Sequence, residues 1–295
     1  MDASVLQEKL RNVLVDDIKQ SVFRVRKDVE QRLRESLAET SHPLARLNLQ
    51  AIIKNLELAK RKQIPLCQDT GVPTFFLEVG SRFPFSLDYK DILETVVRRV
   101  TKSAPLRPNA VVPFTNANSG DNTGQGWPII STNFVSKSEK LRIRFLMKGG
   151  GSENCSGLFM FSPTITIPGI CEKLADWVIA AKGKPCPPVI LGIGIGGDAS
   201  TCLKLAKESL FQSINQDSEP DIPALAQIKR DVVQRVNEYG SGPMGLGGSP
   251  TCIGATITWA MRHPASFPVG LVVQCHAHRG GEVVVHENGE VEVIE

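Results

Sequence analysis

The stretch PVILGIGIGG at residues 188–197 has the clearest structural pattern in the chain. It is a short apolar run that begins after prolines and ends in glycines, which indicates a buried strand. The two segments that follow it, 200–215 and 224–239, have the residue spacing of helices. A strand followed by helices predicts an α/β arrangement in this part of the chain.

The regions on either side predict a mixture of both element types. Residues 3–39 place apolar side chains three and four positions apart, as one long helix does, and a second helix is expected from Pro43 to Lys62 with Ser41 as its cap. Two more helices are expected, at 88–100 and 172–181. Strands are expected at 74–80, 140–148, 251–261 and 269–278, with a final hairpin at 282–295 that turns at Asn288-Gly289 in type I′.

These elements predict a mixed α/β (α+β) fold with a helical N-terminal region. We expect that region to cover residues 1–62 and an α/β body to cover 63–295. The 34 basic and 31 acidic residues give a net charge of +3, which argues against bulk binding of nucleic acid. The first residues are charged and no apolar run is long enough to span a bilayer, so the sequence predicts a cytoplasmic protein without a membrane segment.

Seven cysteines are spread along the chain without a disulfide or zinc-finger spacing. An odd number with no C-x-x-C motif disfavours a disulfide scaffold, a zinc knuckle and a ferredoxin-type run. The remaining possibilities are buried thiols, a nucleophile or metal ligands. The cysteines are Cys67, Cys155, Cys171, Cys186, Cys202, Cys252 and Cys275.

Three of these cysteines stand in segments that could carry chemistry. Cys67 begins the turn Cys67-Gln68-Asp69-Thr70-Gly71, which combines a thiol, an amide and a carboxylate. Cys186 lies in KPCPP (184–188), where prolines stiffen the loop. Cys275 ends a predicted strand in CHAHR (275–279), where cationic neighbours favour the thiolate.

Two other segments could bind ligands. Arg107 lies between two prolines, and its guanidinium suits bidentate binding of a carboxylate. The glycines at 192, 194 and 197 form G-x-G-x-x-G before a predicted helix, with Asp217 and Glu219 about 20 residues further on, as in dinucleotide-binding folds. A nucleotide-dependent oxidoreductase is therefore one alternative. The same glycines could instead let a helix N-terminus bind a carboxylate or phosphate.

Six separated motifs, taken in order, resemble one family. From about residue 10 to 280 the chain is similar to the α region of class I fumarases and L(+)-tartrate dehydratases. The motifs are CQDTG (67–71), LRPN (106–109), KGGGS (148–152), CPP (186–188), GPMGLGG (242–248) and PVG…C-x-A-x-R (268–279).

The resemblance implies a site and a reaction. Three cysteines of that family hold a [4Fe-4S] cluster with one iron open to substrate, and the matching residues are Cys67, Cys186 and Cys275. Gln68, Asp69, Arg107 and Gly150 match residues that bind the substrate, with Asp69 as the acid/base. The implied activity is a hydro-lyase that interconverts malate and fumarate; the alternative substrate is L(+)-tartrate. An electron-transfer protein with four ligands per cluster is the non-catalytic alternative.

The resemblance also implies a partner. Fused members of the family continue beyond the last cysteine motif into a second domain, whereas this sequence ends at Glu295. We therefore expect a separate β subunit and an α2β2 assembly that acts on a small dicarboxylate.

Overall fold

The computed structural model describes residues 2–104, 106–215 and 222–294. Three residues considered above lie outside this part of the chain: Pro105, which precedes Leu106-Arg107, and the acidic residues Asp217 and Glu219. The fold is mixed α/β and begins with a long helix, which confirms the predicted fold class. It divides into two compact units, and both consist of separate segments of the sequence.

The first unit comprises Met1–Val25, Leu56–Lys148 and His278–Glu295. Its sheet has the strand order β2-β1-β3-β8-β9, in which only the β1–β2 pair is parallel. The strands are β1 (Val72–Gly80), β2 (Ile129–Val135), β3 (Leu141–Lys148), β8 (Gly280–Val285) and β9 (Val291–Ile294).

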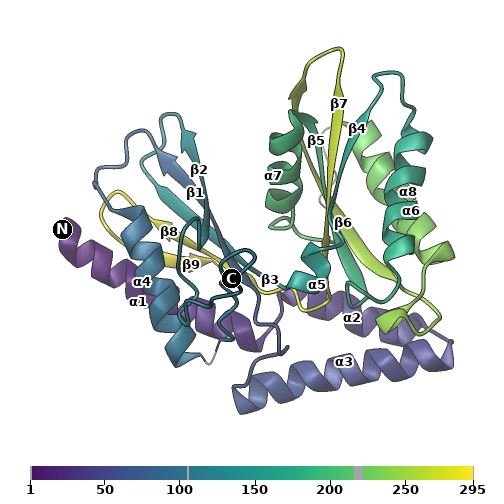
Figure 1. Ribbon diagram of the computed structural model, residues 1–295, viewed down its shortest axis with the longest axis horizontal. Coiled ribbons are helices and arrows are strands. Elements are labelled where there is room, and N and C mark those ends of the chain that lie inside the picture. Colours follow the sequence, from purple (N-terminus) through teal and green to yellow (C-terminus); the bar gives the residue numbers. More distant parts are fainter. Residues whose placement is uncertain (1, 105, 216–221, 295) are drawn as a thin grey trace. The chain divides into compact units, whose positions relative to one another are not determined.

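Two helices complete the core of the first unit, α1 (Ala3–Phe23) and α4 (Tyr89–Ser103), which lie next to each other in Figure 1. Leu6, Leu10 and Leu14 recur every four residues of α1 and are fully buried, because this spacing puts them on one face of the helix. They pack in one cluster with side chains of α4 and of the sheet, such as Val96 and Phe145.

The second unit comprises Arg26–Asn55 and Gly149–Ala277. Its sheet has the order β4-β7-β5-β6, with β5 parallel to β6 and antiparallel to β7. The strands are β4 (Gly157–Phe161), β5 (Val189–Gly197), β6 (Cys252–Arg262) and β7 (Phe267–Gln274). The helices are α2 (Lys27–Glu39), α5 (Gly150–Glu153), α6 (Ile167–Ala181), α7 (Ala199–Ser209), α8 (Pro223–Tyr239) and the short 3₁₀ turn η1 (Pro243–Gly245). The helix α3 (Pro43–Lys62) contains the point at which the units divide.

Helices cover both faces of this second sheet. Figure 1 shows α6 and α8 side by side on one face and α7 on the other. Val189, Leu191 and Ile193 of β5 point towards α6 and α8 and are fully buried, whereas the intervening glycines face α7. This alternation gives β5 two buried faces, which explains why the strand is apolar throughout.

Several boundaries differ from the prediction. The expected helix 3–39 is two helices, because the chain is extended at Arg24 and Arg26. The side chain of Arg26 forms an ion pair with Asp28 at 2.6 Å and fixes the start of α2. At the start of α3, the predicted cap Ser41 is replaced by His42, whose Nδ1 accepts a hydrogen bond from Ala45 N at 3.4 Å.

Further differences concern the second half of the chain. The helix expected over 200–215 ends at Ser209. The hairpin β8–β9 exists, but only Gly289 of the predicted pair has a positive φ, so the turn is not type I′, which requires positive φ at both positions. The strands β2 and β4 were not predicted. The burial of β2 does not alternate regularly, and β4 does alternate, but its exposed positions are occupied by the apolar Leu158 and Met160.

Candidate functional site

The seven cysteines differ sharply in exposure. Cys67 and Cys186 are exposed and Cys275 is partly exposed, whereas Cys155, Cys171, Cys202 and Cys252 are buried. Burial raises the pKa of Cys252 to about 12 and that of Cys171 to about 11. Because the thiolate is the form that binds metals, burial makes such thiols poor ligands.

Cys67 lies in the loop between α3 and β1, in the first unit. The loop turns sharply at Gly71, which has φ +96°; a Cβ there would lie 2.5 Å from the carbonyl carbon of Met147. Gly71 N donates a hydrogen bond at 3.0 Å to Oδ1 of Asp69, so the Asp69 carboxylate helps to close the turn that presents Cys67 and Gln68.

The segment around Arg107 lies directly against this loop. Arg107 N donates to the hydroxyl of Thr70 at 3.0 Å, and Asn109 Nδ2 donates to Asp69 Oδ1 at 3.4 Å. A hollow of about 510 Å³ is lined by Pro65, Cys67, Gln68, Thr70 and Arg107. The structure thus brings Cys67, Gln68, Asp69 and Arg107 together.

A buried arginine supports the same loop from within the first unit. Arg279 is 1% exposed, and its Nη1 donates to the main-chain oxygen of Asp69 at 2.9 Å. Its own carbonyl accepts from Met147 N at 3.0 Å. A charge-assisted hydrogen bond in a buried setting holds the Asp69 peptide in one orientation.

Cys186 and Cys275 lie at one end of the second sheet. The antiparallel register pairs Ile190 of β5 with Gln274 of β7. Cys186 precedes β5 by three residues and Cys275 directly follows β7. Both residues therefore lie at the same end of the sheet. Nδ1 of His276 lies 3.0 Å from the carbonyl oxygen of Cys186 and links the two segments.

The turn that carries Cys186 is strained. Its φ is +55°, a left-handed conformation that costs a non-glycine residue about 1–3 kcal/mol and is found mainly where the surrounding structure enforces it. Cys186 N donates to Gly183 O at 3.0 Å, and Met244 N donates to Pro187 O at 2.8 Å. Hydrogen bonds on both sides therefore hold the strained residue in place.

Close backbone contacts bring two glycine loops to the Cys186 turn. A Cβ at Gly245, which has φ +76°, would lie 2.6 Å from the Cα of Gly183. A Cβ at Gly151 would lie 3.3 Å from Lys184 O. Gly150, the predicted substrate contact, begins the single-turn helix α5 in that second loop, so it belongs to the same unit as Cys186 and Cys275.

The predicted residues are thus divided between the units. Cys67, Gln68, Asp69 and Arg107 belong to the first, and Gly150, Cys186 and Cys275 to the second. Among the described residues, no three His, Cys, Asp or Glu side chains gather tightly enough to hold a metal ion. The donor set itself suits an iron–sulfur group, because its three members are the more exposed thiols of the chain.

Sequence analysis missed the residues that position these groups. Thr70, Asn109 and Arg279 all bond to the Cys67–Gly71 loop or its neighbour. The segment CHAHR was noted for Cys275, its charges and its motif, but not for the hydrogen bond of His276, which spans 90 positions. The available signal for these residues was their place in the motifs CQDTG, LRPN and C-x-A-x-R, next to a predicted ligand or arginine.

The glycines of the nucleotide-like motif have a different role. A Cβ at Gly192 would lie 2.2 Å from Ala206 O, and one at Gly194 would lie 2.0 Å from Cys202 O, so both let α7 pack directly on β5. Asp198 accepts hydrogen bonds from Thr201 N and Ser200 N, which lower its pKa to about 2. The helix N-terminus is therefore already capped by a carboxylate of its own, and this disfavours a phosphate there.

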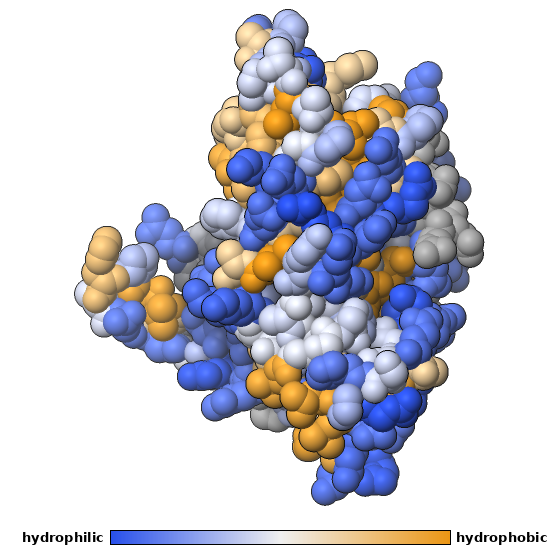
Figure 2. Space-filling view, turned by 90° about the vertical axis from the view of Figure 1, so that its right-hand side faces the viewer, coloured by the Kyte–Doolittle hydropathy of each residue, from blue (hydrophilic) through white to orange (hydrophobic). Residues whose placement is uncertain are grey.

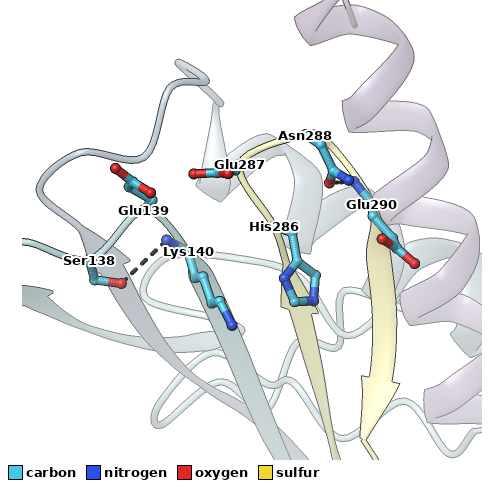
Figure 3. Close-up of a pocket in the computed structure, with 7 residues that line it drawn as sticks. All are labelled: Ser138, Glu139, Lys140, His286, Glu287, Asn288 and Glu290. Atoms are coloured by element: carbon cyan, nitrogen blue, oxygen red, sulfur yellow. Dashed lines mark hydrogen bonds between the residues drawn. The ribbon is translucent and has the colours of Figure 1, made fainter.

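A second hollow, of about 430 Å³, lies at the β8–β9 turn of the first unit and contains none of the predicted site residues. Figure 3 shows the carboxylates of Glu139 and Glu287 pointing towards each other across it. The hydrogen bond and repulsion from Glu139 raise the pKa of Glu287, while His286 and Lys140 oppose the shift.

The described residues include no helix that is both long and apolar enough to cross a membrane. The face drawn in Figure 2 mixes hydrophilic residues with small hydrophobic patches.

Comparison with known proteins gives consistent matches over most of the chain. The family model described as fumarate hydratase (Fumerase) matches residues 11–284. A protein of Methanocaldococcus jannaschii, provisionally named L(+)-tartrate dehydratase subunit alpha, is 38% identical over 278 residues, which are 92% of this chain and 95% of that protein. The L(+)-tartrate dehydratase subunit alpha of Escherichia coli is 30% identical over 278 residues, covering 94% and 91%.

A longer relative also matches. A protein of Geobacillus stearothermophilus, provisionally named fumarate hydratase class I, is 33% identical over 297 residues, which are 96% of this chain but 56% of that protein. The two relatives named as subunit alpha have nearly the length of this chain, and their names imply a separate subunit beta.

Proposed function

Since the chain belongs to the fumarate hydratase (Fumerase) family, we propose that it is the α subunit of an iron–sulfur hydro-lyase acting on a small hydroxy-dicarboxylate. Family membership carries the enzyme class, a hydro-lyase of the class I fumarate hydratase and tartrate dehydratase kind. The ligands, the substrate and the assembly are the proposal.

The proposed cluster ligands are Cys67, Cys186 and Cys275. The observation that carries this choice is the exposure of the thiols: these three are reachable, and the other four are buried. A four-iron cluster held by these three thiolates would supply Lewis-acid chemistry to a substrate hydroxyl group.

The side chains of the first unit would bind and deprotonate the substrate. Arg107 offers a planar guanidinium for one substrate carboxylate, at the hollow that Gln68 also lines. Asp69 is the proposed acid/base, and its hydrogen bond from Gly71 N fixes the orientation of the carboxylate. Gly150 would contribute a main-chain contact from the second unit.

Two substrates fit this chemistry, malate and L(+)-tartrate. Both carry two carboxylates and a hydroxyl group that leaves as water, so the same residues serve either. The names of the relatives favour L(+)-tartrate over malate, which was the first expectation from the sequence. A separate β subunit would complete the enzyme, and an α2β2 assembly is the proposed form.

The test is anaerobic co-expression with a β-type chain, followed by iron analysis and assays with L(+)-tartrate, malate and fumarate. We expect about four irons per α chain and turnover that air abolishes and Fe²⁺ with thiol restores. A colourless chain that binds NAD would contradict the proposal. Full turnover by the α chain alone would reject the separate subunit. A cluster whose EPR spectrum does not respond to substrate would favour electron transfer instead.

A further inference from the structure

The carbonyl oxygen of Cys186 can only accept a hydrogen bond. Nδ1 of His276, 3.0 Å away, must therefore carry a hydrogen and donate it. The ring belongs to the residue that follows Cys275. One side chain thus connects the main chain at the first thiol to the segment that carries the second.

The Cys186 turn needs such a connection more than an ordinary turn does. Its left-handed φ of +55° is unfavourable for a residue with a Cβ, and Cys186 is exposed. The hydrogen bonds from Cys186 N to Gly183 O and from Met244 N to Pro187 O hold the turn from its two flanks. The bond from His276 relates the turn to the segment of Cys275.

The segment of Cys275 is itself anchored. Gln274 is 1% exposed, its partner across the sheet is Ile190 of β5, and its Nε2 donates to Ala277 O at 3.5 Å and points towards the sulfur of Cys275 at 3.9 Å. His276 therefore projects from a fixed strand end, so its ring can hold the turn rather than follow it.

We infer that His276 is a positioning residue that holds the sulfurs of Cys186 and Cys275 in the geometry required to share one metal centre. The inference rests on the proposed function, since it takes these thiols as ligands. Partners that orient metal ligands typically change metal affinity about 10- to 100-fold when they are removed. The role of His276 is of this kind and needs no contact with substrate.

The test uses His276→Leu and His276→Asn, which have similar shapes but differ in hydrogen bonding. The asparagine amide can take the place of Nδ1 and donate to Cys186 O, whereas leucine cannot. In the chain carrying Cys67→Ser, Cd²⁺ titration reports on the two remaining thiols that are not buried, those of Cys186 and Cys275. We expect His276→Leu to weaken Cd²⁺ binding about tenfold and His276→Asn to stay close to the parent.

His286→Leu is the matched control, because it removes a histidine that hydrogen-bonds to Glu292 in the first unit. It should leave Cd²⁺ binding unchanged. Thermal unfolding without metal checks the fold of each variant, and His276→Ala replaces the leucine variant if that one does not fold. Equal Cd²⁺ affinity of parent and His276→Leu would overturn the inference.

The cluster-bearing enzyme provides the second measurement, the rate at which a chelator removes iron. We expect faster loss from His276→Leu and rescue by His276→Asn. If the parent holds iron and all variants lose it equally slowly, the positioning role is wrong while the proposed function survives. If the parent never holds iron but the Cd²⁺ difference remains, the proposed function fails and the positioning role stands.

Discussion

The two units hold their predicted site residues by different means. In the first unit, side-chain hydrogen bonds hold the Cys67–Gly71 loop. Asn109 and Arg279 donate to Asp69, and the Thr70 hydroxyl accepts from Arg107 N. In the second, main chain packs against main chain at Gly183 and Gly245, and the side chain of His276 hydrogen-bonds to the carbonyl oxygen of Cys186. The first should therefore be the more sensitive to changed polar groups, although an added Cβ at Gly71 would also clash there, and the second should be sensitive to an added Cβ at Gly245.

The largest effect should come from the cysteines themselves. Cys67→Ser, Cys186→Ser and Cys275→Ser should each abolish cluster retention, because serine is a poor ligand for iron–sulfur clusters. Cys155→Ser, Cys171→Ser and Cys202→Ser should keep it, since these thiols are buried. Iron and sulfide per chain after anaerobic reconstitution measure the difference. Equal losses of iron in both groups of variants would reject the assignment of these three cysteines as ligands, and with it the idea that both units supply ligands.

The next effect tests the polar site of the first unit. Asp69→Asn should lower kcat about 10²–10⁴-fold, the usual contribution of an acid/base group. Iron content should stay normal, because the amide can still accept from Gly71 N. Asp88→Asn is the control: Asp88 caps α4 by accepting from Asp91 N, and asparagine caps equally well. Unchanged kcat in Asp69→Asn would remove this carboxylate from the mechanism.

The main-chain contacts of the second unit can be tested by adding a methyl group. Gly245→Ala should destabilise the fold by about 2–4 kcal/mol, since it combines left-handed strain with a clash against Gly183. Gly120→Ala has nearly the same φ but open space around it, so it should cost about 1 kcal/mol. Denaturant unfolding of the two variants would show whether packing or φ alone matters.

A buried carboxylate makes the stability of the first unit depend on pH. Burial raises the pKa of Asp17 to about 6, against an opposing effect of Arg24. Between about pH 4 and 6 the unfolded state loses this proton first, so the folded state loses up to about 3 kcal/mol of stability as the pH rises. Asp17→Asn should remove this loss and be more stable than the parent at pH 8 in urea unfolding. Asp16→Asn, which alters an exposed neighbour, should keep the original slope.

The smallest effect concerns the exposed pair in Figure 3. Glu139→Gln removes the carboxylate that raises the pKa of Glu287, so that pKa should fall towards its usual range. An NMR titration of the Glu287 carboxyl group measures the change, and Glu292→Gln, which alters the partner of His286, should not reproduce it. Iron content should be the same in all three proteins, because this hollow contains no proposed ligand.

The sequence predicted most helices and strands because their apolar spacing is regular. The fully buried leucines of α1 and the apolar strand β5 are examples. The sequence did not predict the break at Arg24, because the apolar residues keep their helical spacing into α2 although the helical backbone is interrupted. It missed β4 because Leu158 and Met160 are exposed although apolar.

The candidate residues were predicted in the same uneven way. Residues adjacent in a motif, such as Gln68 and Asp69, are visible in the sequence. The contacts that hold them are not, because Arg279 reaches Asp69 across 210 positions and His276 reaches Cys186 across 90. Only the folded chain reveals those pairings. The predicted division at residue 62 remains a prediction.

The interleaved order of the two units has a consequence for synthesis on the ribosome. The second unit is complete once Ala277 has been made, so both of its exposed thiols can take their places early. The first unit requires Arg279 and the strands β8 and β9, which emerge last. A nascent chain that stalls before this point would contain an organised Cys186–Cys275 pair in one unit, while the Cys67 loop of the other unit still lacks its arginine support.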